Sequence, residues 1–195
     1  MEPVNNKLAA ALCGSAALAL ALTGCGGDDE DDGKAQAWAK KVCDQVQPQV
    51  KKIQGANTAI SEAAAKDSSS AAVQKADSEA FGQLSDAYKS LGSAVSGAGE
   101  PPVDDGAKLR KDAVKELSDI SASYAGLKVK VDKLDTKDQA KFADGLREVA
   151  KELETLGRSG DAALNKLESG DLRTAMSKEP GCSKTGVDKS GPSNA

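Results

Sequence analysis

The chain has 195 residues, of which 39% are hydrophobic, and this length suits one domain with appended segments. That composition excludes a wholly disordered chain and a multi-pass membrane protein. Only 3% of the residues are aromatic, so a core of Ala, Leu and Val is expected, which suits closely packed helices. Six of the 30 acids precede Gly33, but only one of the 26 bases does, which leaves 24 acids and 25 bases. This near balance offers no basic surface for nucleic acid.

The first 24 residues have the pattern of an export signal. Lys7 and the amino terminus supply positive charge, and the 15 residues from Leu8 to Leu22 form an apolar segment. That segment is shorter than the ~20 residues that a permanent membrane-spanning helix needs. Residues 1–24 are therefore expected to be removed, and Cys13 with them.

The sequence Leu22-Thr23-Gly24-Cys25 follows the apolar segment and resembles the lipobox of bacterial lipoproteins. In that family the cysteine thiol accepts a diacylglyceryl group as a thioether, and the small residues before it permit cleavage. The resemblance implies that Cys25 is the lipid-modified first residue of a mature protein anchored to the outer face of the cell membrane. Two acyl chains hold a soluble domain there, whereas one chain binds only marginally. The alternative is a plain secretory signal followed by a disulfide cysteine.

The next residues are expected to form a tether. Residues 25–33 contain Gly26, Gly27 and five consecutive acids, a composition that favours a flexible, self-repelling linker. We expect a helical domain over residues 34–182 and a disordered tail over residues 183–195.

Apolar residues recur at helical spacing in four segments of that domain. The stripes are Trp38, Val42, Val46, Val50, Ile53 and Ile60; Phe81, Leu84, Tyr88, Leu91 and Val95; Ala113, Leu117, Ile120, Tyr124, Leu127, Val131 and Leu134; and Phe142, Leu146, Val149, Leu153, Leu156, Gly160, Ala163 and Leu167. Leu172 and Met176 extend the fourth stripe past Gly170. Pro48 and Gly55 predict that the first helix is kinked or divided.

Turn and capping residues separate these stripes. Residues 67–70 offer an N-cap for the second helix, residues 97–102 are expected to end it, and Asp104 or Asp105 offers an N-cap for the third. Thr136 and Gln139 fit a capping box before the fourth, and the chain after Pro180 has the composition of turn and tail. Steps of three and four residues with short links predict an all-α fold, an antiparallel up-down four-helix bundle.

Removal of the signal and lipidation of Cys25 leave Cys43 and Cys182 as a pair. Disulfides persist outside the cytoplasm, so these two are expected to be bonded. An even number of long helices returns the chain to the end where it began, so this bridge agrees with four helices. The sequence contains no His and no ligand pattern near either cysteine, so we expect no metal and no cofactor.

The absence of His also removes the usual general base, and no enzyme activity is expected. The adjacent pairs Ser177-Lys178 and Ser183-Lys184 are formally able to do Ser-Lys chemistry but are expected to be ordinary solvated residues. A second set consists of carboxylates that lie off the apolar stripes, near lysines. A salt-bridged outer face is favoured for them over a paired-acid site. They are Asp112, Glu116, Glu148 and Glu152.

Three aromatic residues carry polar groups on the inward stripes. Tyr88 and Tyr124 either face a ligand or, as we expect, pack with their hydroxyls reaching towards the surface. Trp38 is either an exposed anchor for a partner or, more often in such folds, a plug at the open end of the bundle.

The outline of lipobox, acidic segment, WAKKVCDQVQPQVKKI and helical body resembles the small secreted lipoproteins of high-GC Gram-positive bacteria. That group has no shared activity to carry over. The leading expectation is a non-catalytic binding module of the cell envelope, with the membrane as its partner through Cys25 and a protein or envelope component as its ligand. The alternatives are a structural spacer and, more remotely, a hydrolase. An apolar groove would favour binding, an evenly charged surface the spacer, and a cleft with perturbed ionisable groups the enzyme.

Overall fold

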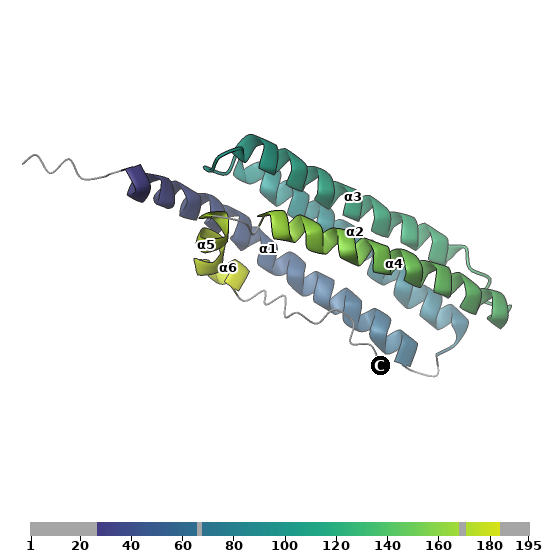
Figure 1. The fold of residues 1–195 in the computed structure, drawn as a ribbon. Coiled ribbons are helices and arrows are strands. Elements are labelled where there is room, and N and C mark those ends of the chain that lie inside the picture. Colours follow the sequence, from purple (N-terminus) through teal and green to yellow (C-terminus); the bar gives the residue numbers. More distant parts are fainter. Residues whose placement is uncertain (1–26, 66–67, 168–170, 184–195) are drawn as a thin grey trace, which may run out of the picture.

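The computed structural model describes residues 27–65, 68–167 and 171–183, and every element in these ranges is a helix. The helices are α1 (Gly27–Ala65), α2 (Ser70–Ala98), α3 (Gly106–Asp132), α4 (Gln139–Leu167), α5 (Asp171–Lys178) and α6 (Pro180–Ser183). Figure 1 shows α1 to α4 lying alongside one another, with α5 and α6 against α1. The all-α bundle predicted from the sequence is confirmed. Within the described ranges, no helix is both long and apolar enough to cross a membrane.

α2 and α3 make the most extensive contact of any two helices described. The Ser85 hydroxyl donates to the Ser121 carbonyl oxygen at 2.9 Å, and the Ser121 hydroxyl donates to the Ser85 carbonyl oxygen at 2.8 Å. A short side chain reaches the backbone of a neighbouring helix only when the two axes lie close together. These reciprocal bonds therefore fix the antiparallel register of the pair near its middle.

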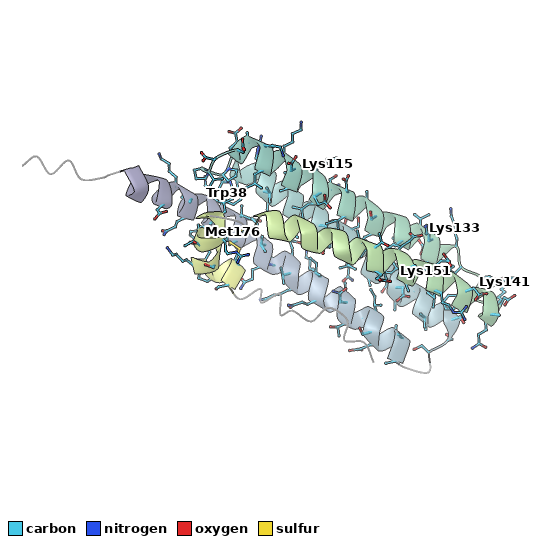
Figure 2. The ribbon with its side chains drawn as sticks, in the orientation of Figure 1. Trp38, Lys115, Lys133, Lys141, Lys151 and Met176 are labelled. Atoms are coloured by element: carbon cyan, nitrogen blue, oxygen red, sulfur yellow. A yellow bond between two sulfur atoms is a disulfide. The ribbon has the colours of Figure 1, made fainter. Side chains whose placement is uncertain are left out.

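The buried apolar side chains gather in two clusters, one towards each end of the bundle. The disulfide-end cluster consists of Ala35, Trp38, Ala39, Val42, Val95, Ala113, Leu117, Leu172 and Ala175. The turn-end cluster consists of Ala56, Ala80, Phe81, Leu84, Leu127, Val131 and Val149. In Figure 2, Trp38 and Met176 mark the first end, and Lys133 and Lys141 mark the second. α5 completes the first cluster, whereas α4 contributes to the second.

α1 is one helix that contains Pro48, so the expectation that it divides near Pro48 or Gly55 is wrong. Both residues are exposed, and the buried residues Val42 and Ala56 on either side of them pack in the two clusters. Packing on both sides outweighs the hydrogen bond that proline removes. The kink predicted at the same place stays a prediction.

The helix α1 begins at Gly27, which corrects the expected flexible tether over residues 25–33 for all but its first two residues. Residues 27–33 are helical, so the acidic run belongs to the first turns of α1. Gly26 and the proposed lipidation site Cys25 lie outside the described residues.

Two of the predicted helix boundaries are confirmed. Ser69 is the N-cap of α2, and its hydroxyl accepts the N–H of Ala72 at 3.3 Å. At the other end of α2, Gly99 has φ of 86°, which lies in the region that glycine adopts readily. Asp105 precedes α3 as expected, but at φ of 57° its carboxylate makes no capping hydrogen bond.

The capping box predicted at Thr136 and Gln139 is wrong. α4 begins at Gln139, so Asp138 is the residue in the capping position. The Asp138 Oδ1 atom accepts the N–H of Lys141 at 3.1 Å. That backbone hydrogen bond, with a further side-chain bond from Lys141, lowers the pKa of Asp138 below its usual value.

The carboxyl-terminal part also differs from its prediction. α4 ends at Leu167, and Leu172 and Met176 belong to the separate helix α5. Pro180 begins α6, where turn and tail were expected, because proline is well tolerated in the first turn of a helix. Residues 184–195, most of the predicted tail, lie outside the described residues.

Two glycines of α3 should respond in opposite ways to substitution by alanine. A Cβ atom at Gly126 meets nothing within 4 Å, whereas one at Gly106 would overlap the Pro101 carbonyl oxygen. Gly126→Ala should raise the free energy of unfolding by up to about 1 kcal/mol. Gly106→Ala should lower it by about 1 to 3 kcal/mol, because the loop before α3 must shift. Urea denaturation measures both changes, and equal shifts would contradict the packing at Gly106.

Candidate functional site

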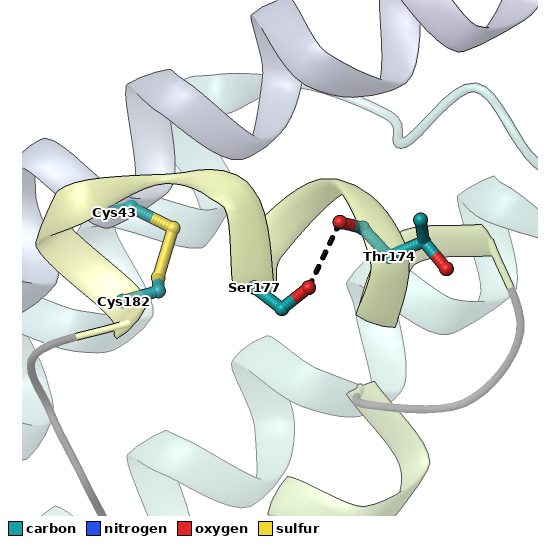
Figure 3. Close-up of a disulfide and its surroundings, with 4 residues drawn as sticks. All are labelled: Cys43, Thr174, Ser177 and Cys182. Atoms are coloured by element: carbon teal, nitrogen blue, oxygen red, sulfur yellow. Dashed lines mark hydrogen bonds between the residues drawn. A yellow bond between two sulfur atoms is a disulfide. The ribbon is translucent and has the colours of Figure 1, made fainter.

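The disulfide end of the bundle is held together by a covalent bond. Cys43 of α1 and Cys182 of α6 are bonded, and their Cα atoms lie 5.1 Å apart. Figure 3 shows α5 and α6 folded back so that Cys182 reaches the side of α1. Cys43 is only 1% exposed. The predicted pairing is confirmed, and it agrees with four long helices that return the chain to its starting end.

Gly181 explains how α6 approaches α1 so closely. A Cβ atom at this position would overlap the carbonyl oxygen of Cys43. Glycine has no Cβ atom, so the backbones of the two helices can meet beside the disulfide. The sequence signal for this contact is a glycine that directly precedes a bonded cysteine.

Trp38 closes the same end of the bundle. It is 4% exposed and lies in the disulfide-end cluster. Its indole Nε1 atom donates a hydrogen bond to the Gly99 carbonyl oxygen at 3.0 Å, which links α1 to the end of α2. Trp38 is therefore the plug that the sequence favoured, and the alternative of an exposed anchor is wrong.

Tyr88 and Tyr124 stack where the two clusters meet. Their ring centroids are 5.5 Å apart and the rings are inclined by 15°. Tyr88 packs against the disulfide-end cluster and Tyr124 against the turn-end cluster. Burial, and to a smaller extent Tyr88, raises the pKa of Tyr124 above its usual value. This arrangement supports packing of the two side chains over a ligand-facing role.

Gln49 is a polar residue near this junction that the sequence reading missed. It lies on α1 between Val46 of one cluster and Ile53 of the other. Within the described residues its buried Oε1 atom has no hydrogen-bond partner. Its spacing of three and four residues from those neighbours would have placed it on the first apolar stripe.

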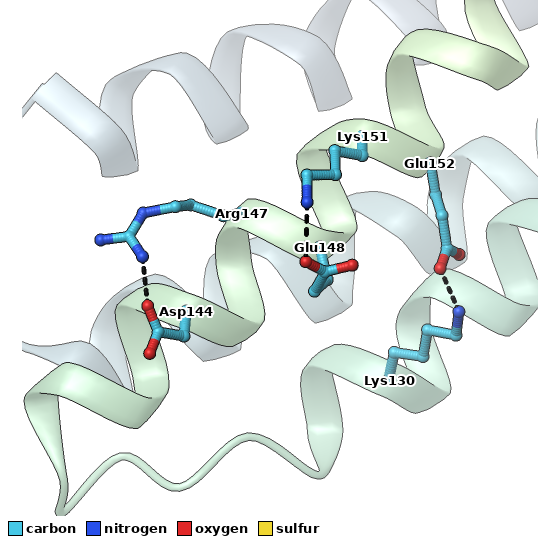
Figure 4. Close-up of polar contacts among 6 residues, drawn as sticks. All are labelled: Lys130, Asp144, Arg147, Glu148, Lys151 and Glu152. Carbon is cyan, nitrogen blue, oxygen red and sulfur yellow. Dashed lines mark hydrogen bonds and ion pairs between the residues drawn. The ribbon is translucent and has the colours of Figure 1, made fainter.

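Three of the four carboxylates considered as a paired-acid site have basic partners. Figure 4 shows Glu148 bonded to Lys151 at 2.9 Å along α4, and Glu152 bonded to Lys130 of α3. Asp112 accepts from Lys108 at 2.6 Å on α3, where Glu116 is partly buried. Lys151 lowers the pKa of Glu148 below its usual value, chiefly through their hydrogen bond. The salt-bridged outer face is confirmed for Asp112, Glu148 and Glu152, whereas for Glu116 it stays a prediction.

The two Ser-Lys pairs are ordinary surface residues as far as they are described. The Ser177 hydroxyl donates to the Thr174 carbonyl oxygen at 3.0 Å, and both Ser177 and Lys178 are exposed (Figure 3). Ser183 is exposed as well, and Lys184 lies outside the described residues. The described part of the chain contains no group of three or more Cys, Asp or Glu side chains arranged to hold a metal ion.

The sequence reading also missed Asp77, the most deeply buried carboxylate among the described residues. It is 7% exposed on the inner side of α2. Asp77 lies four residues before Phe81 and seven before Leu84, so extending the second stripe towards the amino terminus would have reached it.

Comparisons with protein-family models, with curated proteins and with solved structures found no match for the chain.

Breaking the disulfide should markedly destabilise the bundle. The bridge closes a loop across 139 positions, which corresponds to about 5 kcal/mol in the chain-entropy model of the unfolded state. We expect the double variant Cys43→Ala, Cys182→Ala to have a free energy of unfolding lower than that of the oxidised protein by several kcal/mol. Urea denaturation of the oxidised protein, the reduced protein and the double variant provides the measurement. An unchanged midpoint after reduction would contradict a stabilising bridge.

Proposed function

We propose that the chain is an exported lipoprotein, held at the outer face of the cell membrane by a lipid on Cys25, with a non-catalytic helical domain. The observation that carries this proposal is the Cys43–Cys182 disulfide. Such bonds persist in oxidising compartments and are rare in the cytoplasm. The bond thus adds independent support for export to the apolar segment and the sequence Leu22-Thr23-Gly24-Cys25.

The start of α1 gives the proposed anchor a defined relation to the domain. Cys25 precedes the first helical residue, Gly27, by two positions, so a lipid on Cys25 would leave only a short connection. The disulfide end, which contains Trp38, would then lie nearer the bilayer than the turn between α3 and α4. Any component met away from the membrane would approach the turn end first.

Between the two non-catalytic roles, the described surface favours the structural spacer over a binding module with an apolar groove. Ion pairs between neighbours on one helix recur along the bundle, such as Lys40 with Asp44 on α1 and Lys75 with Glu79 on α2. Val129, at 50%, is the one exposed large hydrophobic residue among those described. Specific docking surfaces normally present a contiguous apolar patch.

Substitution of Cys25 tests the anchor. Cys25→Ala should abolish lipidation, because the thiol is the acceptor, and should leave the protein unprocessed or released from the membrane. Mass spectrometry of the mature amino-terminal peptide distinguishes a diacylglyceryl thioether from a free thiol. Cys13→Ala is the matched control and should leave the modified peptide unchanged. A wild-type mature protein with unmodified Cys25, or with another first residue, would overturn the lipoprotein proposal.

Crosslinking in the native envelope tests the choice of role. A spacer should give only weak, heterogeneous adducts that follow abundance, since its surface is evenly charged. A photocrosslinker at exposed Val129 should therefore yield no dominant partner, and one at exposed Lys137 at the turn end serves as the comparison. A single adduct recovered reproducibly from one of these positions would favour the binding module instead.

A further inference from the structure

Asp77 lies on the buried face of α2 at the turn end. It is 7% exposed, and the turn-end cluster residues Phe81 and Leu84 follow it on the same face of α2. The neighbouring Gln74 and Ser78 both reach the end of α3, where Gln74 Nε2 donates to the carbonyl oxygens of Val131 and Leu134 at 2.9 Å. Asp77 is therefore an acid at the inner face of α2, level with the last turn of α3.

Within the described residues, no hydrogen bond or ion pair reaches Asp77. Burial is the sole cause that raises the pKa of its carboxyl, to about 6, so no neighbouring charge contributes to that shift. The charged side chains around this end lie on outer faces, and most form ion pairs with one another. They are Glu62 of α1, Lys75 and Glu79 of α2, Lys128, Lys130, Asp132 and Lys133 of α3, and Lys141, Asp144, Arg147, Glu148, Lys151 and Glu152 of α4.

The two ends of the bundle are held in different ways. At the disulfide end a covalent bond joins α1 to α6, and the Trp38 indole bonds the end of α2. At the turn end α1 is held by apolar contacts, in which Ala56 is buried and Ile60 partly buried against the cluster. A charge that appears in the interior there can be relieved by local separation of helices while the disulfide end stays closed.

We propose that Asp77 is a proton-dependent latch, so that the turn end is closed when the carboxyl is protonated and loosens when it is ionised. Ionisation places a charge on a residue that is 7% exposed and to which the described residues offer no counter-ion, and opening returns that charge to water. Loosening would expose the apolar faces of α1 and α2 at this end. Proton concentration would thus control access to the turn-end cluster, a property beyond anchoring or spacing.

The direction of the pH dependence follows from the raised pKa. The pKa of Asp77 is about 6 in the closed form, whereas in the open form it returns to its ordinary value of 3.8. Stability from this group is fully present below 3.8 and is lost as the pH rises through 6. Between pH 5 and 7.5 the ratio of closed to open forms should fall about tenfold. Asp132, Asp138 and Glu148 have lowered pKa values and therefore titrate below this window.

Native-state hydrogen exchange of the oxidised protein tests the latch. After correction for intrinsic exchange rates, protection in residues 53–65 and 70–84 should fall about tenfold between pH 5 and 7.5, while residues 35–46 change little. Asp77→Asn should remove that fall, because the amide does not titrate. Asp86→Asn is the matched control, since Asp86 is an exposed acid on the same helix, and it should keep the wild-type response.

Three results would overturn the proposal. The first is a turn end whose protection in the wild-type protein is independent of pH, and the second is a loss of protection that is uniform along the bundle. The third is a pH response that persists in Asp77→Asn. If that variant fails to fold, a ¹³C NMR titration of the Asp77 carboxyl in the wild-type protein decides instead. A midpoint near 6 supports the latch, and one near 3.8 refutes it.

Discussion

The close antiparallel contact between α2 and α3 is the constraint from which the rest of the bundle is built. The reciprocal bonds of Ser85 and Ser121 require the two backbones to lie close together, and the buried Gly92 meets Leu117 across the same interface. This contact sets the register of two helices and with it the positions of the residues that line the interior. α1 packs against α2, and α4 packs against α3.

The two apolar clusters differ in the contacts that hold the helices together around them. The disulfide end combines a buried tryptophan, a covalent bond and a glycine that admits α6, so its geometry is determined by several independent contacts. The turn end contains Phe81 with leucine, valine and alanine side chains from α1 to α4, together with the Asp77 carboxyl, which has no partner among the described residues. The two ends of the bundle are therefore held together by different kinds of contact.

Charged residues on the outer surface form ion pairs along each of the four long helices. Lysines and acids three or four residues apart neutralise one another along each helix, which keeps the bundle soluble without creating a field of one sign. Such a surface gives little energy to a specific complex, since exposed ion pairs contribute little. On the lipoprotein proposal, such a surface fits a domain that occupies a position beside the membrane more than one that selects a ligand.

Much of the architecture could be predicted from the sequence because it depends on local spacing. Steps of three and four residues gave the long helices, Ser69 and Gly99 gave the boundaries of α2, and two remaining cysteines left one pairing. Other features could not be read in this way. The continuity of α1 through Pro48 depends on packing on both sides, and the return of α5 and α6 depends on the surface that α1 offers them.

The burial of two polar residues could not be predicted from the sequence either. Gln49 and Asp77 occupy apolar stripes, but a stripe shows only which residues share a face of one helix. Whether such a residue is solvated or buried depends on which helices cover that face, and this is decided when the bundle assembles. The sequence by itself determined the four long helices and the boundaries of α2 at Ser69 and Gly99, because these follow from neighbours along the chain, and it left Cys43 and Cys182 as a pair. Only the tertiary structure decided that Asp77 is buried and has no partner among the described residues, because burial is a property of all the packed helices together.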